Sequence, residues 1–350
     1  MRSEGSASAF AGGVSISIRI IGALAGVSLG IGLGCGHRRS AEIAWQAQAT
    51  APVVIARGLT YRYFPEGDPL VVGSRSDALT LDVDLRAPGL HVGVAAESPI
   101  QGQTGKAFGN AYTVRDWCVR RNALAGINGG FFGQTSGQRK QIIGLLVTGS
   151  AVRSPGRKIR SPSHPDRRFV RCTLGFTREG LPRIGWVTSE GASVLRAHER
   201  PLNPIASQPW QVDSAVACGP RLIAGGQLAI TDREERLGSP LALPRTFVAY
   251  DVEGIGAQAR PRHLLLGIAM QMTFADVAAF VQRYFRQIHH TACAEAMCLD
   301  GGSSSQLVYR APAGHLAATG AHAQDYVDTR PSFVTVPTAI LVETTSGLAP

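Results

Sequence analysis

The chain has 350 residues, of which 44% are hydrophobic and 17% charged, so it is not intrinsically disordered and can build one large or two ordinary domains. Its 41 glycines and 20 prolines have no repeating period, which excludes a helical bundle and indicates many short strands joined by turns. The formal charge of +10 is almost entirely arginine, because only Lys106, Lys140 and Lys158 are lysines, and this bias alone does not indicate a nucleic-acid-binding protein.

The first 35 residues have the pattern of an export signal. Residues 20–34 are uncharged, follow Arg19 and end in small residues directly before Cys35. The run is too short and glycine-rich for a stable membrane span, and it favours a signal-peptide apolar region over a buried helix. The place of Cys35 resembles a bacterial lipoprotein processing site, although Gly32 stands where an aliphatic residue is usual. We expect an exported protein of the periplasm or cell envelope, with Cys35 as the candidate lipidation site and contact with the membrane through that anchor.

Strands and turns alternate after a polar, Ala-rich tether over residues 36–52. Residues 79–85 alternate apolar and polar side chains, as a half-buried strand does. Residues 113–123 predict a helix capped by Thr113, and later hairpin-sized strand pairs include one with a turn near Glu179–Gly180.

The strongest helix signal spans residues 273–288, where apolar residues form one stripe and Thr273 and Asp276 have the spacing of a capping box. This helix leads into a strand, a tight loop and a second strand within residues 296–308. Because no linker follows residue 52, we predict one α+β domain over residues 53–345, a strand-rich mixed sheet with a few packed helices.

Export also changes the interpretation of the remaining cysteines. They form no CxxC pair and have no histidines at zinc-finger spacing, so disulfides are favoured over a metal site. Their number is odd, so one is expected to stay free, and Cys293 with Cys298 is a candidate pair. The five cysteines are Cys118, Cys172, Cys218, Cys293 and Cys298.

One stretch, over residues 153–171, concentrates positive charge. A solvated loop is the preferred interpretation, and contact with an anionic polymer or membrane surface is the alternative. The stretch lacks the interleaved aromatic residues that stack on bases, which argues against nucleic acid. Its basic residues are Arg153, Arg157, Lys158, Arg160, Arg167, Arg168 and Arg171.

Chemistry is expected in four loops: 128–130 (NGG), 218–221 (CGPR), 244–246 (PRT) and 300–304 (DGGSS). Glycine at a strand end lets backbone approach a ligand and leaves amide donors available. Asp300 follows an apolar run, so burial would raise the pKa of its carboxyl and a neighbouring arginine would lower it. Asp-Gly alone is a common hairpin turn, but three serines follow here where a hairpin would resume its alternation.

Two other enzyme classes fit poorly. GGSSSQ lacks the last glycine of the G-x-S-x-G motif, so a serine nucleophile is the minority interpretation and Ser303 and Ser304 are expected to bind ligand. GQTGK at 102–106 lacks the first glycine and the hydroxyl residue of a phosphate loop. Arg221 and Arg245 have apolar neighbours and need an anion, either a ligand's phosphate or carboxylate or, equally well, Asp213, Asp251 or Asp300.

Together, INGGFF (127–132), CGPRLIAGG (218–226), PRTFVAY (244–250) and LDGGSSSQLV (299–308) resemble the phosphodiester glycosidase family, which includes the uncovering enzyme that removes N-acetylglucosamine from mannose 6-phosphate. The resemblance covers residues 53–345 and implies hydrolysis of a sugar-1-phosphodiester. The chain departs from the family at residues 267–272, GIAMQM, where an Asp-Gly-Arg-like segment is usual.

The resemblance implies catalytic roles for Asp300, Arg245 and Asn128. Asp300 is expected to act as acid/base or nucleophile, and Arg245, with Arg221, to hold the phosphate. Sugar or phosphate oxygens would contact Asn128, Thr246 and Ser304. The remaining expected substrate-binding residues are Gly129, Gly130, Gly301, Gly302 and Ser303.

Several points stay open from the sequence. A second carboxylate would be Asp251, Asp213 or Glu190. No cofactor is required, and a divalent cation stays open. The expected partner is a sugar phosphate or anionic glycan. The alternative functions are a non-catalytic envelope lipoprotein that binds an anionic polysaccharide, and a basic surface protein that uses residues 153–171.

Overall fold

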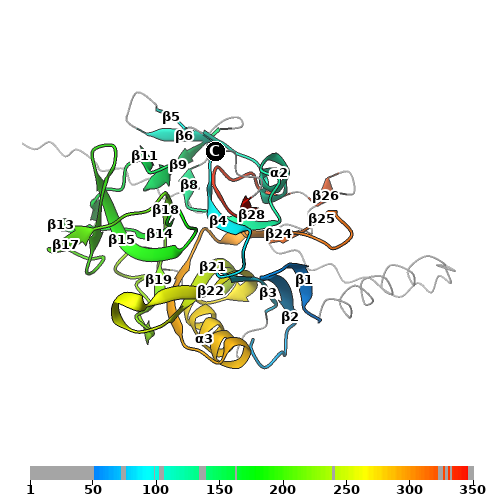
Figure 1. Cartoon of the computed structure of the whole chain (residues 1–350). Helices are drawn as coiled ribbons and strands as arrows, with labels where there is room; N and C mark the ends of the chain where they lie inside the picture. Colours follow the sequence, from blue (N-terminus) through cyan, green and yellow to red (C-terminus); the bar gives the residue numbers. More distant parts are fainter. Residues whose placement is uncertain are drawn as a thin grey trace, which may run out of the picture. The chain divides into compact units, whose positions relative to one another are not determined.

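A computed structural model describes residues 51–71, 76–97, 99–101, 106–133, 139–161, 164–238, 241–321, 326–327, 330–331 and 333–345. The predicted signal segment, Cys35 and nearly all of the tether lie outside these residues. The described residues belong to one compact unit that is rich in strands and has few helices, as predicted for an α+β domain (Figure 1). Among them, no helix has the length and apolar character to cross a membrane.

The largest sheet has eight strands among the described residues, all paired antiparallel. Its centre is the long hairpin of β21 (Leu243–Glu253) and β22 (Arg260–Met272), and β23 (Cys293–Cys298) returns beside β21. In spatial order the strands are β1 (Val53–Ala56), β2 (Leu59–Phe64), β3 (Ala78–Asp84), β22 (Arg260–Met272), β21 (Leu243–Glu253), β23 (Cys293–Cys298), β19 (Arg221–Ala224) and β20 (Gln227–Leu228).

Two smaller antiparallel sheets face this large sheet. The five-stranded sheet runs β25 (Leu316–Gly320), β24 (Gln306–Arg310), β7 (Ala125–Asn128), β28 (Ala339–Thr344) and β4 (Leu90–Ala95). The seven-stranded sheet runs β11 (Ala151–Ser154), β10 (Leu146–Thr148), β18 (Ser214–Cys218), β14 (Cys172–Phe176), β15 (Pro182–Glu190), β16 (Val194–His198) and β17 (Ser207–Pro209). The predicted turn near Glu179–Gly180 is confirmed as the connection between β14 and β15.

The remaining strands among the described residues are short. A four-stranded sheet contains β5 (Ile100–Gln101), β6 (Ala107–Asn110), β9 (Arg139–Ile142) and β8 (Phe132–Gly133). Two hairpins pair β12 (Ile159–Ser161) with β13 (His164–Phe169), and β26 (Tyr326–Val327) with β27 (Arg330–Pro331). The sequence predicted one mixed sheet, and the structure instead divides antiparallel strands among several sheets.

Both predicted helices form, and their caps explain where they start. Helix α2 (Val114–Arg120) begins after Thr113, whose hydroxyl accepts from the Asp116 amide. Helix α3 (Phe274–Tyr284) begins with the predicted capping box of Thr273 and Asp276 and ends in a π-helical turn, η2 (Phe285–His289). The short 3-10 turns are η1 (Gly256–Gln258) and η3 (Gly302–Ser304).

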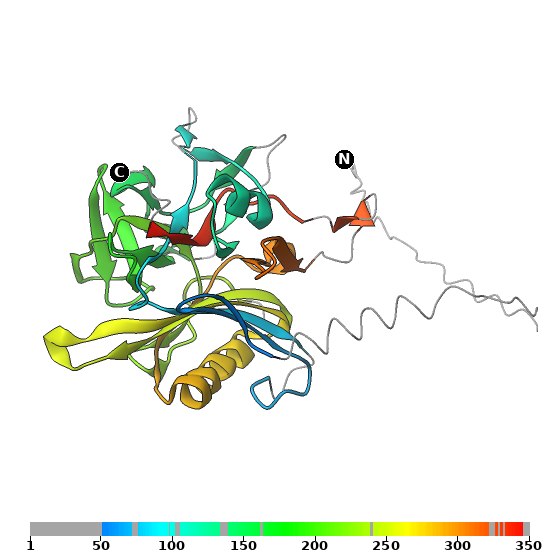
Figure 2. The same ribbon diagram turned by 45° about the vertical axis from the view of Figure 1, so that its right-hand side comes forward.

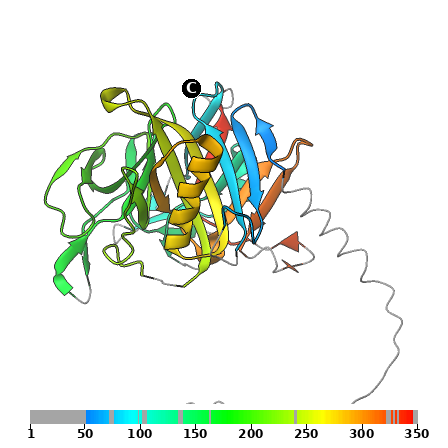
Figure 3. The same cartoon turned by 90° about the horizontal axis from the view of Figure 1, so that it is seen from below.

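The core lies on both faces of the large sheet. Helix α3 covers one face (Figures 2 and 3), where it packs against Phe247 and Ala249 of β21. The other face meets the two smaller sheets through Val248 and Tyr250 of β21. Because side chains alternate along a strand, consecutive residues of β21 enter different cores.

The expectation of disulfides among the five cysteines is wrong, because all five are buried free thiols. The pair Cys293–Cys298 fails for a geometric reason. The two residues are the ends of β23, and five residues of extended chain span roughly 17 Å, whereas disulfide-bonded Cα atoms lie within about 7 Å.

Candidate active site

Three of the four predicted loops meet where strands of different sheets end together. β7 ends at Asn128, β23 leads to Asp300, and β21 carries Arg245 and Thr246 close to its start at Leu243. The backbone joins them, because the Leu299 amide donates to Thr246 O at 2.8 Å and the Asp300 amide donates to Gly129 O at 3.1 Å. The 218–221 loop is attached through the Gly219 amide, which donates to Cys298 O at 3.1 Å.

Asn128 is the buried centre of this junction, with no exposed surface. Its Nδ2 donates to Asp300 O at 2.7 Å. Its Oδ1 accepts from the Thr246 hydroxyl at 2.8 Å and from the Gln306 amide at 3.0 Å. One side chain therefore ties the β7, β21 and β24 segments to the backbone of Asp300.

Thr246 is buried as deeply, and its hydroxyl also lies 3.1 Å from Ser305 Oγ. The resemblance implied that Asn128 and Thr246 contact substrate oxygens. In the structure their polar atoms bind protein groups instead, so both hold the loop in place below the surface. Ser304 is also buried and hydrogen-bonds the Asp300 carboxylate, whereas Ser303 is exposed.

Asp300 is the titratable group that this junction presents, and its side chain is half-buried. Burial raises the pKa of its carboxyl from 3.8 to about 6, and hydrogen bonds from the Ser304 side chain and the Gly301 amide limit the rise. The predicted lowering by an arginine does not occur, because no arginine contributes to this pKa. A carboxyl of this kind changes protonation close to neutral pH, as acid/base catalysis requires.

The glycines of the loops make room mainly for the protein itself. A Cβ on Gly129 would lie 2.4 Å from Thr338 Oγ1, one on Gly130 2.5 Å from Ala217 O, and one on Gly301 2.7 Å from Pro244 O. At these three positions the protein itself fills the space where a side chain would begin. Gly302 differs, because its φ is +60° and nothing occupies the space where a Cβ would stand.

The two arginines expected to bind phosphate are both engaged elsewhere. Arg221 forms an ion pair with Glu295, with its Nε 3.1 Å from Glu295 Oε2, and lies over the Trp186 ring at 4.8 Å. The alternative of an internal ion pair is therefore confirmed for Arg221, with Glu295 in place of Asp213, Asp251 or Asp300.

Arg245 is buried on the α3 side of the large sheet. Its Nε donates to Met272 O at 3.1 Å, its Nη2 donates to Leu241 O at 2.9 Å, and its guanidinium lies 4.0 Å from the centre of the Phe274 ring. Thr246 points to the opposite face, because adjacent strand residues alternate. Arg245 and Thr246 therefore cannot line the same pocket.

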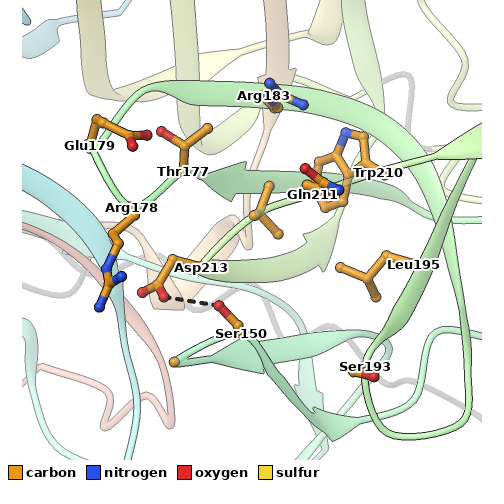
Figure 4. Close-up of a pocket in the computed structure, with 12 residues that line it drawn as sticks. Ser150, Thr177, Arg178, Glu179, Arg183, Ser193, Leu195, Trp210, Gln211 and Asp213 are labelled. Atoms are coloured by element: carbon orange, nitrogen blue, oxygen red, sulfur yellow. Dashed lines mark hydrogen bonds between the residues drawn. The ribbon is translucent and has the colours of Figure 1, made fainter.

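The proposed second carboxylates also lie away from Asp300. Asp213 lines an open cleft of about 740 Å³ with Arg178, Glu179 and Trp210, and accepts from the Ser150 hydroxyl at 3.1 Å (Figure 4). It precedes β18, whose far end carries Cys218 next to the site, roughly 17 Å along the strand.

The other two candidates have different partners as well. Asp251 lies 2.8 Å from His263 Nδ1 and accepts from the Thr291 hydroxyl. Glu190 is exposed and forms a surface ion pair with Arg196. The structure therefore does not bring any of the three beside Asp300.

A buried carboxylate that no sequence pattern indicates, Glu235, lies under the 218–221 loop. Its oxygens accept from the Cys172 amide at 2.8 Å, Trp186 Nε1 at 3.0 Å and the Thr231 hydroxyl at 2.6 Å. Burial raises the pKa of Glu235 against these hydrogen bonds. The surrounding TDREER segment, residues 231–236, is polar throughout, so no periodicity marks Glu235 as buried.

The described residues contain no cluster of three or more His, Cys, Asp or Glu side chains arranged to hold a metal ion.

Comparison with known proteins places the geometry in a family. Two solved structures are similar over much of the chain. A hypothetical protein from Synechocystis has 14% sequence identity and a TM-score of 0.49. The match covers 82% of this chain and 62% of that protein. A protein from Burkholderia pseudomallei has 15% identity and a TM-score of 0.40, with 77% of this chain and 74% of that protein covered. No curated protein matches.

The sequence profile of the phosphodiester glycosidase family matches residues 121–343, more than half of the chain and all four of the loops discussed above. This match agrees with the resemblance found in the sequence. The chain belongs to the phosphodiester glycosidase family.

Proposed function

We propose that this protein is an exported glycosidase that hydrolyses a sugar-1-phosphodiester in envelope or extracellular glycans, and that Asp300 is its catalytic carboxylate. The observation that carries the proposal is the Asp300 carboxyl, half-buried with a pKa raised to about 6, on a loop fixed by Asn128. Family membership supports the reaction class. The export signal supports the location.

The chemistry follows from the leaving group. A phosphomonoester leaves readily as an anion, so the bond between the anomeric carbon and the phosphate oxygen can break with little protonation. The remaining need is an activated water. Ionised Asp300 would take a proton from water as the water oxygen attacks the anomeric carbon, and the phosphomonoester would depart. One carboxylate is sufficient for this scheme.

The other predicted residues take supporting roles in this proposal. Asn128 and Thr246 position the loop, and Arg245 supports it from behind, since its Cα lies 3.8 Å from the place of a Gly301 Cβ. Gly302 and Ser303 face outward and are the proposed substrate contacts within the loop. Cys35 remains the proposed lipid attachment site.

The test is sugar release from a panel of α- and β-linked sugar-1-phosphodiesters by the purified protein. Asp300→Asn is expected to abolish release. Asp213→Asn, the same change in the separate cleft of Figure 4, is expected to leave it intact. Full turnover by Asp300→Asn would refute the assignment. Binding of a panel member without any turnover would favour the alternative, an envelope lipoprotein that binds an anionic polysaccharide.

A further inference from the structure

A small cavity lies next to the junction, and we name it the arginine cavity. Its volume is about 170 Å³, far more than the roughly 15 Å³ that one water molecule needs. Its walls are largely apolar and include Leu145, Val187 and Ala217. Arg157 and Arg171 are its charged lining residues, and no carboxylate is among them. The described lining therefore combines two positive charges with apolar walls.

Arg171 is held in this cavity by aromatic rings and one carbonyl. Its guanidinium lies 5.0 Å from the centre of the Phe169 ring and 5.5 Å from that of Phe131. Its Nη1 donates to Glu235 O. Its Nε is buried and has no hydrogen-bond partner among the described residues. A buried charged donor without a partner is destabilising, and an anion would satisfy it.

The protein's own carboxylates do not take this place. Glu235 interacts electrostatically with Arg171, but its oxygens already accept from an amide, an indole and a hydroxyl. Arg157 adds a second positive charge at the exposed side of the cavity. An incoming anion would thus meet two arginines and no competing carboxylate among the described lining residues.

The cavity borders the candidate active site through shared residues. Ala217 lines the cavity, and its carbonyl lies 2.5 Å from the place of a Gly130 Cβ in the 128–130 loop. Phe131 follows that loop and carries the Arg171 guanidinium on its ring. Cys218 follows Ala217 and leads to Gly219, whose amide donates to Cys298 O at 3.1 Å, two residues before Asp300. The backbone that lines the cavity is therefore hydrogen-bonded to the segment that carries Asp300.

We propose that the arginine cavity binds the phosphoryl group of the substrate, with Arg171 and Arg157 as the phosphate ligands. This inference rests on the proposed function. It assigns phosphate binding to Arg171 and Arg157 in place of Arg221, which pairs with Glu295, and Arg245, which donates to backbone carbonyls. It also gives a role to two residues of the basic stretch 153–171. Arginine suits this role because its planar fork matches phosphate oxygens.

The test is calorimetric titration of the full-length protein with inorganic phosphate, with chloride as the comparison salt. Arg157→Gln and Arg171→Gln are each expected to weaken phosphate binding about tenfold or more. Arg178→Gln is the matched control, because Arg178 lines the separate cleft in Figure 4. The affinity of this variant for phosphate is expected to equal that of the wild type. Arg157 is exposed, so its variant is expected to fold even if Arg171→Gln does not.

Kinetics separates this inference from the proposed function. If the protein hydrolyses a panel member, the two variants should raise KM for that substrate, whereas Arg178→Gln should not. Wild-type phosphate affinity and wild-type KM in both variants would overturn the arginine cavity and leave the role of Asp300 standing. Arginine-dependent phosphate binding in a protein without any turnover would support the cavity and refute the proposed hydrolysis.

Discussion

Replacing Asp300 by Asn is expected to stabilise the protein at neutral and alkaline pH while it removes activity. Burial raises the folded-state pKa of Asp300 from 3.8 to about 6, a difference of about two units. Each unit corresponds to about 1.4 kcal/mol, so ionised Asp300 destabilises the folded state by about 3 kcal/mol. The asparagine keeps the shape of the side chain without its charge.

The sign of the pH dependence follows from proton binding. Between pH 4 and pH 6 the folded protein holds a proton on Asp300 that the unfolded chain releases, so this group favours folding as the pH falls. The gain from Asp300→Asn is therefore expected to be largest, up to about 3 kcal/mol, near pH 8 and to shrink toward zero near pH 4. Lost hydrogen bonds from Ser304 and Gly301 would reduce it.

Urea denaturation of wild type and variant at pH 4, 6 and 8 measures this difference. Glu190→Gln is the control, because Glu190 is exposed and forms a surface ion pair with Arg196, for which an effect within about 1 kcal/mol is expected. A variant that is less stable than wild type at pH 8, or a gain that does not change with pH, would refute the argument that burial of a charge strains this site.

Four further substitutions, one of them a comparison, test the buried framework by thermal or urea denaturation. Asn128→Ala leaves two hydrogen-bond donors and one carbonyl without their partner, so a loss of about 2–4 kcal/mol in the free energy of unfolding is expected. The same variant should lower kcat more than it changes KM, and a wild-type kcat would contradict the positioning role of Asn128. Gly302→Ala should cost about 1 kcal/mol of stability, because only the positive φ opposes alanine there. Gly130→Ala should cost more, because it places a methyl group against the Ala217 carbonyl. Equal losses in the two variants would contradict the close packing at Gly130. Glu235→Ala should cost at least about 3 kcal/mol, and a smaller loss would show that the 218–221 loop does not depend on it.

The local elements could be predicted because their signals are short-range. The capping box of Thr273 and Asp276 and the apolar stripe after it specify α3 without reference to the rest of the chain. The turn near Gly180 is similar, since a glycine with φ of +78° stands between two strands that pair as a hairpin. The division of strands among several sheets depends on long-range pairing, which no local pattern contains.

The site was predicted in part for the same reason. Asp300 could be found because a carboxylate follows an apolar run at a glycine loop. The sequence also contains a signal for the placement of Arg245. Arg245 and Thr246 are neighbours in an alternating strand, so only one of them can face the junction. Glu235 and Arg171 could not be distinguished from other charged residues in their segments, because burial there depends on the tertiary fold.

The most direct measurement is the pH dependence of kcat/KM for sugar release from the best member of the sugar-1-phosphodiester panel, in wild type and Asp300→Asn. If ionised Asp300 activates water, the kcat/KM of the wild type should fall tenfold per pH unit below a pKa of about 6. Asp300→Asn should have no activity in this pH range. A variant with wild-type turnover, or an activity that stays constant as the pH falls well below 6, would contradict the catalytic role of Asp300.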